Sequence, residues 1–389
     1  MTHDQAAAFP TAPEEVTADH IAAAFHDPKL ANVLYHDWEA GTYDEKWSIS
    51  YDERCIDYAR GRFAHVAGTD GWPYASALEI GSGTGFFLLN LKQAGVLDQG
   101  HVTDLSPGMV EVAVRNARSL GFDVEGRVAD AESLPYDDES FDLVVGHAVL
   151  HHIPDLDLAL REVLRVLKPG GRFVFAGEPT RRGDWVARRL SGLTWWTASR
   201  VTQLPALKEK WARTRAELDE SSRAAALEGV VDIHTFDPDR LAAMCLRAGA
   251  VDVRTVTEEL TASWFGWPVR TFEAAVKPGA LGWNWAMFAY KGWLRLSWLD
   301  ENVLTHVVPH ELFYNVSVTG VKPACPARSP SARRSMRPCC WREWGASRAA
   351  CAGCLRATRG RPSTSPGPRC AGCGATARSR AGTCCATGG

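Results

Sequence analysis

The chain has 389 residues, enough for one large domain or two modest ones, and its 46% hydrophobic and 23% charged residues are ordinary for a globular protein. The net charge of −3 hides an asymmetry, because residues 324–389 carry twelve arginines against one glutamate, which leaves −14 for residues 1–323. An acidic body offers no basic groove, so the composition argues against a DNA or RNA substrate.

Cysteines follow the same division. Only Cys55 and Cys245 precede residue 324, and the other nine follow it. A body with few cysteines is typical of a reducing compartment, and the N-terminus lacks the basic and apolar segments of a signal peptide. The most apolar stretch, residues 281–298, is interrupted by Lys291 and Arg295 and barely reaches membrane-spanning length. We therefore expect a cytoplasmic protein.

The N-terminal part of the chain divides into two segments. Residues 1–16 are rich in Ala, Pro and Glu and are predicted to be disordered. In residues 17–72, apolar and aromatic side chains recur at helical spacing, which predicts a cover of two or three helices.

From residue 73 to residue 323, short apolar runs alternate with helical patterns, and Pro169-Gly170-Gly171 is expected to end one of the helices. This alternation predicts an α/β fold with a largely parallel sheet covered on both faces. The predicted strands are residues 75–80, 101–105, 123–128, 141–146, 172–176, 251–257 and 312–321.

Two segments, residues 181–230 and 259–309, do not follow the alternation, and the second contains six tryptophans. Long insertions in a compact α/β domain are usually lids or substrate-binding elements. We expect both to form the acceptor pocket.

The loop after the first strand has the pattern Glu-x-Gly-x-Gly-x-Gly over residues 79–85. Its glycines let backbone amides approach a ligand, and the following helix N-terminus favours an anionic group. A dinucleotide loop would need a third glycine at position 86, where Phe86 stands. An ordinary tight turn is the alternative.

Acidic residues follow the next two strands. Asp104, followed by Leu105, ends the second strand 23 residues after Gly81, and its carboxylate can accept both hydroxyls of a ribose. Asp130 and Ala131 follow the third strand. A helix cap at Asp104 and a solvated loop carboxylate at Asp130 are the alternatives.

Taken with residues 140–145, 147–154 and 167–171, these motifs resemble class I S-adenosylmethionine (SAM)-dependent methyltransferases of the type-11 group, in order and spacing, over residues 75–178. That group includes ubiquinone/menaquinone C-methyltransferases and natural-product enzymes. The resemblance implies a Rossmann-like sheet of seven strands and SAM as cofactor. It implies that SAM is bound by Glu79, Gly81, Ser82, Gly83, Gly85, Asp104, Leu105, Asp130, Ala131 and His147, and it implies no metal.

The resemblance also implies that an aromatic residue upstream closes over the methionine end of SAM. Tyr43 is our candidate and Trp47 the reserve, since an aromatic face suits a sulfonium cation. The alternative is that these aromatics pack two helices together.

Methyl transfer is an in-line displacement, so a general base is needed only where the acceptor must lose a proton. His147, His151 and His152 follow the fourth strand at the ligand-binding edge of the sheet, and we take His147 as the catalytic candidate. For His151 and His152 a structural role is the alternative.

The expected acceptor is a small lipophilic molecule such as a quinone, an isoprenoid or a polyketide, with no specific nucleic acid as partner. Aromatic residues in 259–309 can line its pocket or rest on a bilayer, with Lys291 and Arg295 reaching the headgroups. A helical hairpin with its own core is the alternative there. A SAM-binding but non-catalytic partner subunit and a protein methyltransferase remain as other functions, and no signal sets an oligomeric state.

Residues 324–389 contain Cys351-x-x-Cys354 and Cys370-x-x-Cys373, a spacing that matches a four-cysteine zinc site. The segment has no Ile, Val, Phe or Tyr from which to build a core around a metal. We therefore expect a disordered extension derived from a frameshift, with a basic arm for nucleic acid as the alternative.

Overall fold

The structure is a computed structural model that describes residues 24, 26–215, 217, 231–277 and 279–324, all within one unit of the chain, Met1–Ala327. The predictions for residues 1–16, for residues 218–230 of the first insertion and for the cysteine-rich segment from residue 325 onward lie outside the described residues.

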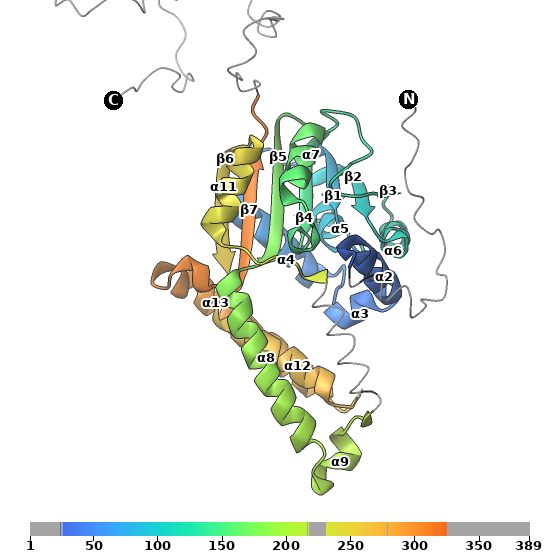
Figure 1. Ribbon diagram of the computed structural model, residues 1–389, viewed down its shortest axis with the longest axis vertical. Helices are drawn as coiled ribbons and strands as arrows, with labels where there is room; N and C mark the ends of the chain where they lie inside the picture. The colour runs from blue at the N-terminus through green and yellow to red at the C-terminus, as the bar shows by residue number, and fades with distance from the viewer. Residues whose placement is uncertain (1–23, 25, 216, 218–230, 278, 325–389) are drawn as a thin grey trace, which may run out of the picture. The chain divides into compact units, whose positions relative to one another are not determined.

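Seven strands form a single sheet in the order β3-β2-β1-β4-β5-β7-β6 (Figure 1). The first five strands run parallel, whereas β7 is antiparallel to both of its neighbours, β5 and β6. The strands are β1 (Tyr74–Ile80), β2 (Leu97–Asp104), β3 (Val124–Val128), β4 (Phe141–His147), β5 (Leu167–Pro179), β6 (Val251–Glu258) and β7 (Asn315–Val321).

The helices connect these strands and precede the sheet. They are α2 (Pro28–Glu39), α3 (Tyr43–Trp47), α4 (Glu53–Ala67), α5 (Phe86–Gln93), α6 (Pro107–Ser119), α7 (Leu156–Val166), α8 (Arg181–Val201), α9 (Pro205–Trp211), α11 (Pro238–Ala248), α12 (Thr261–Ala275) and α13 (Trp283–Asn302), with short 3₁₀ turns η1 (Leu150–His152), η2 (Leu304–His306) and η3 (His310–Leu312). Several of these helices begin at a capping side chain that the sequence predicts, such as Ser106 before Pro107 and Asp237 before Pro238.

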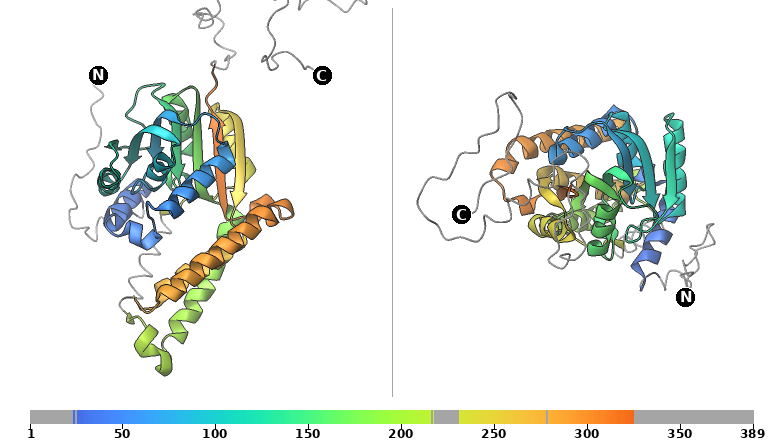
Figure 2. Two further views of the ribbon diagram at one scale, coloured as in Figure 1. Left: turned by 180° about the vertical axis from the view of Figure 1, so that it is seen from behind. Right: turned by 90° about the horizontal axis from the view of Figure 1, so that it is seen from above.

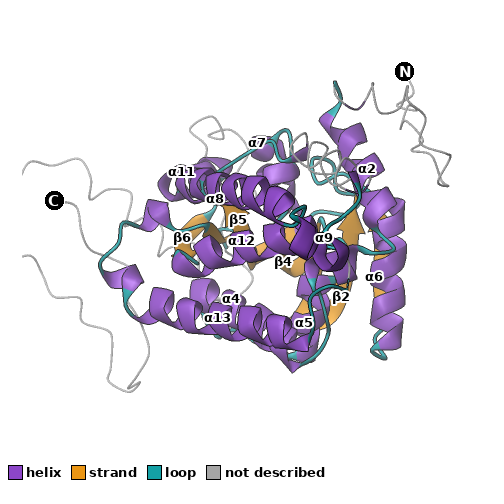
Figure 3. Cartoon of the chain, turned by 90° about the horizontal axis from the view of Figure 1, so that it is seen from below, coloured by secondary structure: helices purple, strands orange, loops and turns teal. Residues whose placement is uncertain are grey.

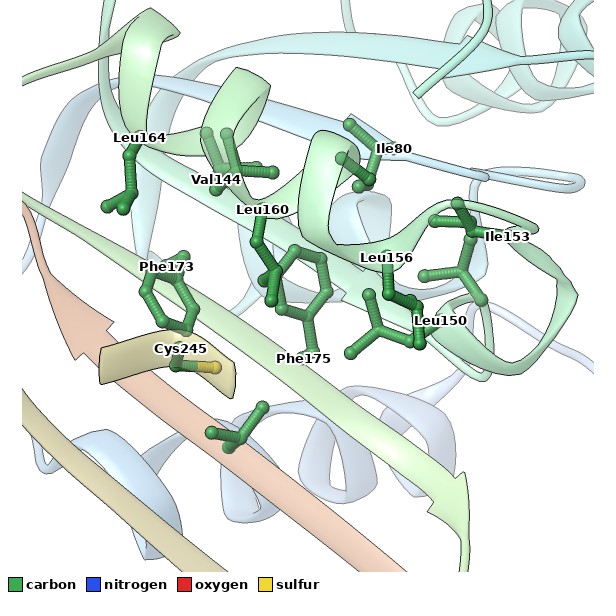
Figure 4. Packing of buried hydrophobic residues seen from close by; sticks show 14 of the residues in the cluster. Ile80, Val144, Leu150, Ile153, Leu156, Leu160, Leu164, Phe173, Phe175 and Cys245 are labelled. Carbon is green, nitrogen blue, oxygen red and sulfur yellow. The ribbon is translucent and has the colours of Figure 1, made fainter. Parts of the chain in front are cut away.

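The core has two halves, one on each face of the sheet. On one face α7 and α11 pack their apolar sides onto β1, β4 and β5, with Leu160, Phe173 and Phe175 almost fully buried (Figure 4). On the other face α4, α5 and α6 bury Phe63, Phe87 and their neighbours against the same strands. A central sheet buried on both sides explains why its strands are continuous apolar runs.

Helices α8, α9, α12 and α13, which we call the arm helices, lie at the carboxyl edge of the sheet and not over either face (Figures 1 and 2). α12 packs against both α8 and α13 (Figure 3). The Asp300 carboxylate of α13 accepts hydrogen bonds from the backbone N–H groups of Leu260, Thr261 and Ala262, at 2.9, 3.0 and 2.9 Å, and so caps α12 from a neighbouring helix. No helix in the described part of the chain is long and apolar enough to cross a membrane.

The seven-stranded α/β fold is confirmed, and the predicted strand positions agree with it. One local prediction was wrong: Pro169-Gly170-Gly171 lies inside β5, which already begins at Leu167, and does not form a loop before it. Gly170 donates to the Lys322 carbonyl at 2.9 Å and Lys322 donates to the Gly171 carbonyl at 2.8 Å, so the residues after β7 hold this segment in the sheet.

Candidate active site

The order of the strands reverses between β1 and β4, and the loops after these two strands meet at the carboxyl edge of the sheet. In open α/β folds this reversal creates the crevice in which ligands bind. A cavity of about 720 Å³ opens at this edge. Every residue that the sequence predicts for the donor site lines the cavity except Gly85.

The three glycines of the loop have left-handed backbones but different surroundings. A Cβ on Gly81 would lie 2.0 Å from a methyl group of Val149, and one on Gly85 would lie 2.9 Å from Leu89, so packing as well as φ requires glycine at both. A Cβ on Gly83 would meet only Tyr43, at 3.9 Å. Gly83 is therefore the glycine whose bare backbone faces the cavity.

Asp104 stands at the end of β2, beside this loop. Its Oδ2 accepts the backbone N–H of Gly83 at 2.8 Å, and its Oδ1 accepts that of Ser106 at 2.9 Å. Burial raises the pKa of Asp104 to about 6, against the lowering effect of these hydrogen bonds. A carboxylate has about four lone-pair directions, so both oxygens retain capacity to accept a hydroxyl group from the cavity.

Glu79 lies near the end of β1, and Ser82 belongs to the Gly-rich loop that follows. The Glu79 carboxyl group accepts the backbone N–H of Leu88 at 3.1 Å and joins the end of β1 to α5, and burial raises its pKa well above the ordinary value. The Ser82 backbone donates to the Thr103 carbonyl at 2.9 Å. Within the described residues, the buried hydroxyl oxygens of Ser82 and Thr84, both on the cavity wall, have no hydrogen-bond partner.

Asp130 and Ala131 also line the cavity, but Asp130 has a partner that the sequence does not reveal. Lys29 of α2 forms ion pairs of 2.6 Å with both Asp130 and Glu132. The second Asp130 oxygen accepts the backbone N–H of Glu132 at 2.9 Å. Helix α2 therefore covers the end of the cavity that follows β3.

Tyr43 and Trp47 of α3 flank the same cavity, with ring centroids 6.1 Å apart. Trp47 already carries two cations over its ring, Arg270 of α12 at 4.5 Å and Lys46 at 5.2 Å. Tyr43 stands next to Gly83. Both rings therefore border the same cavity as Gly83.

His147 ends β4 and is enclosed by aromatic side chains. Its Nε2 forms a hydrogen bond of 3.2 Å with the Tyr58 hydroxyl, and its ring lies 5.3 and 5.4 Å from the rings of Phe86 and Phe87. Burial, helped by the nearby Arg62 guanidinium, lowers the pKa of His147 to about 4. His147 is therefore a neutral imidazole at physiological pH.

His151 also lines the cavity but has a different environment. Its Nδ1 donates to the fully buried Glu178 at 2.9 Å, and its Nε2 lies 3.7 Å from Asp232. Although burial lowers it, the pKa of His151 is raised overall because Glu178 and Asp232 stabilise the protonated ring. The neighbouring His152 donates from Nδ1 to the Val231 carbonyl at 2.9 Å, and burial lowers its pKa well below the ordinary value.

The far wall of the cavity is aromatic and comes from α4 and the arm helices. Tyr58 and Trp293 have ring centroids 6.5 Å apart, and Phe265, Trp267 and Tyr290 line the same wall. Sequence reasoning missed Lys29, Tyr58 and Glu178. Their helical or strand positions carry no motif, and only the fold brings them to the cavity.

Residues 78–175 match the family model of a methyltransferase domain. The chain therefore contains a methyltransferase domain, and over this segment it is similar to SAM-dependent methyltransferases of the type-11 group. The matched segment runs from β1 to β5 and contains the Gly-rich loop, Asp104, Asp130 and His147.

Two curated relatives and one solved structure illustrate this likeness. The chain is 31% identical over 172 residues to the ubiquinone/menaquinone biosynthesis C-methyltransferase UbiE of Vibrio parahaemolyticus, covering 43% of this chain and 60% of the relative. It is 32% identical over 169 residues to the methyltransferase GfsG of Streptomyces halstedii, covering 41% and 60%. Phosphoethanolamine N-methyltransferase 2 of Haemonchus contortus, solved with SAM, aligns with a TM-score of 0.44 and 16% identity over 74% of this chain and 60% of that one. The chain spans 60% of the length of these curated relatives.

SAM is the methyl donor expected of such a methyltransferase domain, and the residues present fit it. The open side of Gly83, the two Asp104 oxygens and the unpartnered Ser82 hydroxyl provide the small surface and the acceptors that an adenosyl group and an amino-acid group require.

Proposed function

We propose that the chain transfers the methyl group of SAM to a small lipophilic acceptor. The observation that carries this proposal is that one cavity of about 720 Å³ is lined both by Gly83 and Asp104 and by aromatic residues of α4 and the arm helices. Apolar walls with a few convergent polar groups are typical of a small-molecule site. The names of the relatives, one of them a quinone C-methyltransferase, agree with such an acceptor.

In this proposal the donor is held by the residues that the sequence singles out. The loop from Gly81 to Gly85 and the Asp104 carboxylate hold the nucleoside and amino-acid ends, and Tyr43 closes over the sulfonium. Asp130 and Ala131 hold the adenine. The ion pair between Lys29 and Asp130 weakens when the adenine binds, so that Asp130 can accept its amino group. SAM supplies an activated methyl group, and the protein orients the acceptor and excludes water.

Where the acceptor must lose a proton, two histidines can accept it. His147 is neutral but weakly basic, because its pKa is lowered to about 4. His151 is the stronger base, because Glu178 orients its ring and raises its pKa. If His147 is the base, the rate should stay constant down to pH 5. If His151 is the base, the rate should rise with pH through a pKa above 6.5 and lose this dependence in Glu178→Gln.

The proposal is tested by calorimetry and by product analysis. S-adenosylhomocysteine should bind the wild-type chain, and Asp104→Ala should weaken its binding about 10- to 100-fold, since two charge-assisted hydrogen bonds are lost. Incubation with methyl-labelled SAM and a lipid extract of the host should yield a labelled small molecule. No binding would refute the donor site, and binding without a labelled product would favour a non-catalytic partner subunit.

If the label appears in protein and not in a small molecule, the result would favour a protein methyltransferase.

Contact of residues 259–309 with a membrane surface also belongs to the proposal, because a lipophilic acceptor resides in the bilayer.

A further inference from the structure

Large apolar side chains are exposed mainly on one part of the molecule. Among the described residues, sixteen large hydrophobic side chains are exposed, and twelve of them lie on the arm helices and the turns that join or follow them. Scattered exposed apolar residues are normal, but a concentration of this kind marks an interaction surface.

The outer face of α8 carries a single stripe of three apolar and two basic residues: Trp185, Arg189, Leu193, Trp196 and Arg200. The spacing of four, four, three and four residues places all five on one side of the helix. Trp185, Leu193 and Trp196 are 56, 60 and 55% exposed.

The opposite face of α8 is buried and consists of small residues. Gly183, Ala187 and Ala198 are its buried positions, and α12 packs against this helix. The stripe is therefore the face of α8 that the rest of the described fold leaves open.

Each arginine of the stripe is stacked on the tryptophan four residues before it. The Arg189 guanidinium lies 3.9 Å from the centroid of Trp185, and that of Arg200 lies 4.5 Å from the centroid of Trp196. Stacking leaves the edge of a guanidinium free, and this edge matches a phosphate group in geometry. Indole rings prefer the boundary between headgroups and acyl chains.

The charge of this region differs from that of its surroundings. Residues 181–213, which include α8 and α9, carry eight basic residues against two acidic ones, whereas residues 1–323 as a whole carry −14. An anionic surface would attract this region and repel the rest of the body, which sets one orientation.

We propose that the stripe on α8, with the basic residues of α9, docks the protein on the surface of an anionic lipid bilayer. The docking is peripheral, since no described helix can cross a membrane. This inference rests on the proposed function, because the arm helices also line the cavity and would bring its aromatic end to the bilayer from which a lipophilic acceptor comes.

The test uses the full chain and two kinds of vesicle, phosphatidylcholine alone and phosphatidylcholine with about one-third phosphatidylglycerol, in a sedimentation assay. The wild type should bind the anionic vesicles at least tenfold more strongly than the vesicles of phosphatidylcholine alone. Its binding to the anionic vesicles should weaken as salt is added. Arg189→Glu/Arg200→Glu should lower this binding at least tenfold, and Trp185→Ala/Trp196→Ala should lower it on the same vesicles without a change in charge.

A matched control is Arg115→Glu/Arg118→Glu on α6, which changes the charge equally at two exposed arginines away from the arm helices. Its affinity for the anionic vesicles should lie within about twofold of that of the wild type. The α6 and α8 arginine variants both retain the arginines of residues 324–389. None of the four stripe residues to be replaced lines the cavity, so the affinity for S-adenosylhomocysteine should be unchanged in every variant.

Equal loss of vesicle binding in the α6 and α8 variants would overturn the inference, since binding would then follow net charge alone. Vesicle binding that is unchanged in the stripe variants would also overturn the inference. This includes the outcome in which the stripe variants disrupt a dimer but still bind vesicles as the wild type does. A chain that docks through the stripe but transfers no methyl group would contradict the proposed function and leave the docking intact.

Discussion

Gly81 and Gly83 have nearly the same backbone conformation, with φ of 56° and 51°, yet they should respond differently to replacement by alanine. Gly81→Ala drives a methyl group into Val149 and adds left-handed strain, so we expect a loss of about 2–5 kcal/mol in the free energy of unfolding. Gly83→Ala should cost only about 1–2 kcal/mol, because its Cβ would meet only Tyr43, at an ordinary contact distance of 3.9 Å. Urea unfolding measures both.

The same two variants separate folding from donor binding. Because Gly83 faces the cavity, Gly83→Ala should weaken S-adenosylhomocysteine binding in a chain that is still folded. Unchanged affinity in this variant would contradict the position given to Gly83 in the donor site.

His147 should make the stability depend on pH. Its pKa is lowered to about 4 in the folded chain, so between pH 6.5 and 4 the unfolded chain binds more protons than the folded one. Stability therefore falls as the pH decreases through this range, by about 2 kcal/mol at pH 5 relative to pH 7. His147→Asn should remove this part of the pH dependence in urea unfolding, whereas an unchanged profile would show that His147 is not buried as described.

At the level of residues, sequence patterns predicted the positions that depend on local geometry. The glycines and Asp104 follow strands directly, so their place at the sheet edge is set by the chain near them. Lys29, by contrast, reaches Asp130 from a helix about one hundred positions earlier, and no spacing rule connects the two. Arg270 likewise reaches the ring of Trp47 from α12, a contact between distant segments that no sequence pattern indicates.

Among the elements, the cap of α12 is the contact most suited to a test. Asp300 accepts three backbone N–H groups and the Thr261 hydroxyl, the last at 2.6 Å. Asp300→Ala leaves these donors without a partner, and we expect a loss of about 2–4 kcal/mol together with faster hydrogen exchange in α12.

Glu301→Ala is the control, since Glu301 is exposed on the next position of α13 and its removal should cost less than about 0.5 kcal/mol. Donor binding should persist in both variants, because neither residue lines the cavity. Equal stability of the two would show that the cap contributes nothing.

The elements of the sheet could be predicted because each is a continuous apolar run between turn residues. The start of β5 could not be predicted in this way, since Pro169-Gly170-Gly171 has the composition of a loop. Backbone hydrogen bonds of Gly170 and Gly171 with Lys322 hold this segment in the sheet. The arm helices could be recognised as departures from the alternation, but the packing of α12 against α8 depends on contacts between distant segments.

For the whole molecule, the sheet order sets where the chain can be shortened. β7 lies between β5 and β6, so it is an interior strand although it is the last one described. A chain ending at residue 327 keeps β7 and the bond of 2.7 Å from Lys322 to the Leu167 carbonyl, so its thermal midpoint should lie within about 3 °C of the full chain, a change below about 1 kcal/mol. A chain ending at residue 314 should not fold.

The shortened chain also tests the interpretation of the cysteine-rich segment. We expect no zinc to co-purify with the full chain and no change in donor affinity when residues 328–389 are removed. One tightly held zinc per chain, lost in Cys351→Ser, would contradict the expectation of an unstructured extension.

The interior place of β7 also governs when the domain can be completed during synthesis. Strands β5 and β6 leave the ribosome first and must remain apart, or separate again, until their shared neighbour arrives. At about 5–20 residues per second, the 56 residues between Glu258 and Asn315 take roughly 3–11 s to translate. For these seconds the edges of β5 and β6 have no strand between them, and they can pair with the exposed edges of another nascent molecule.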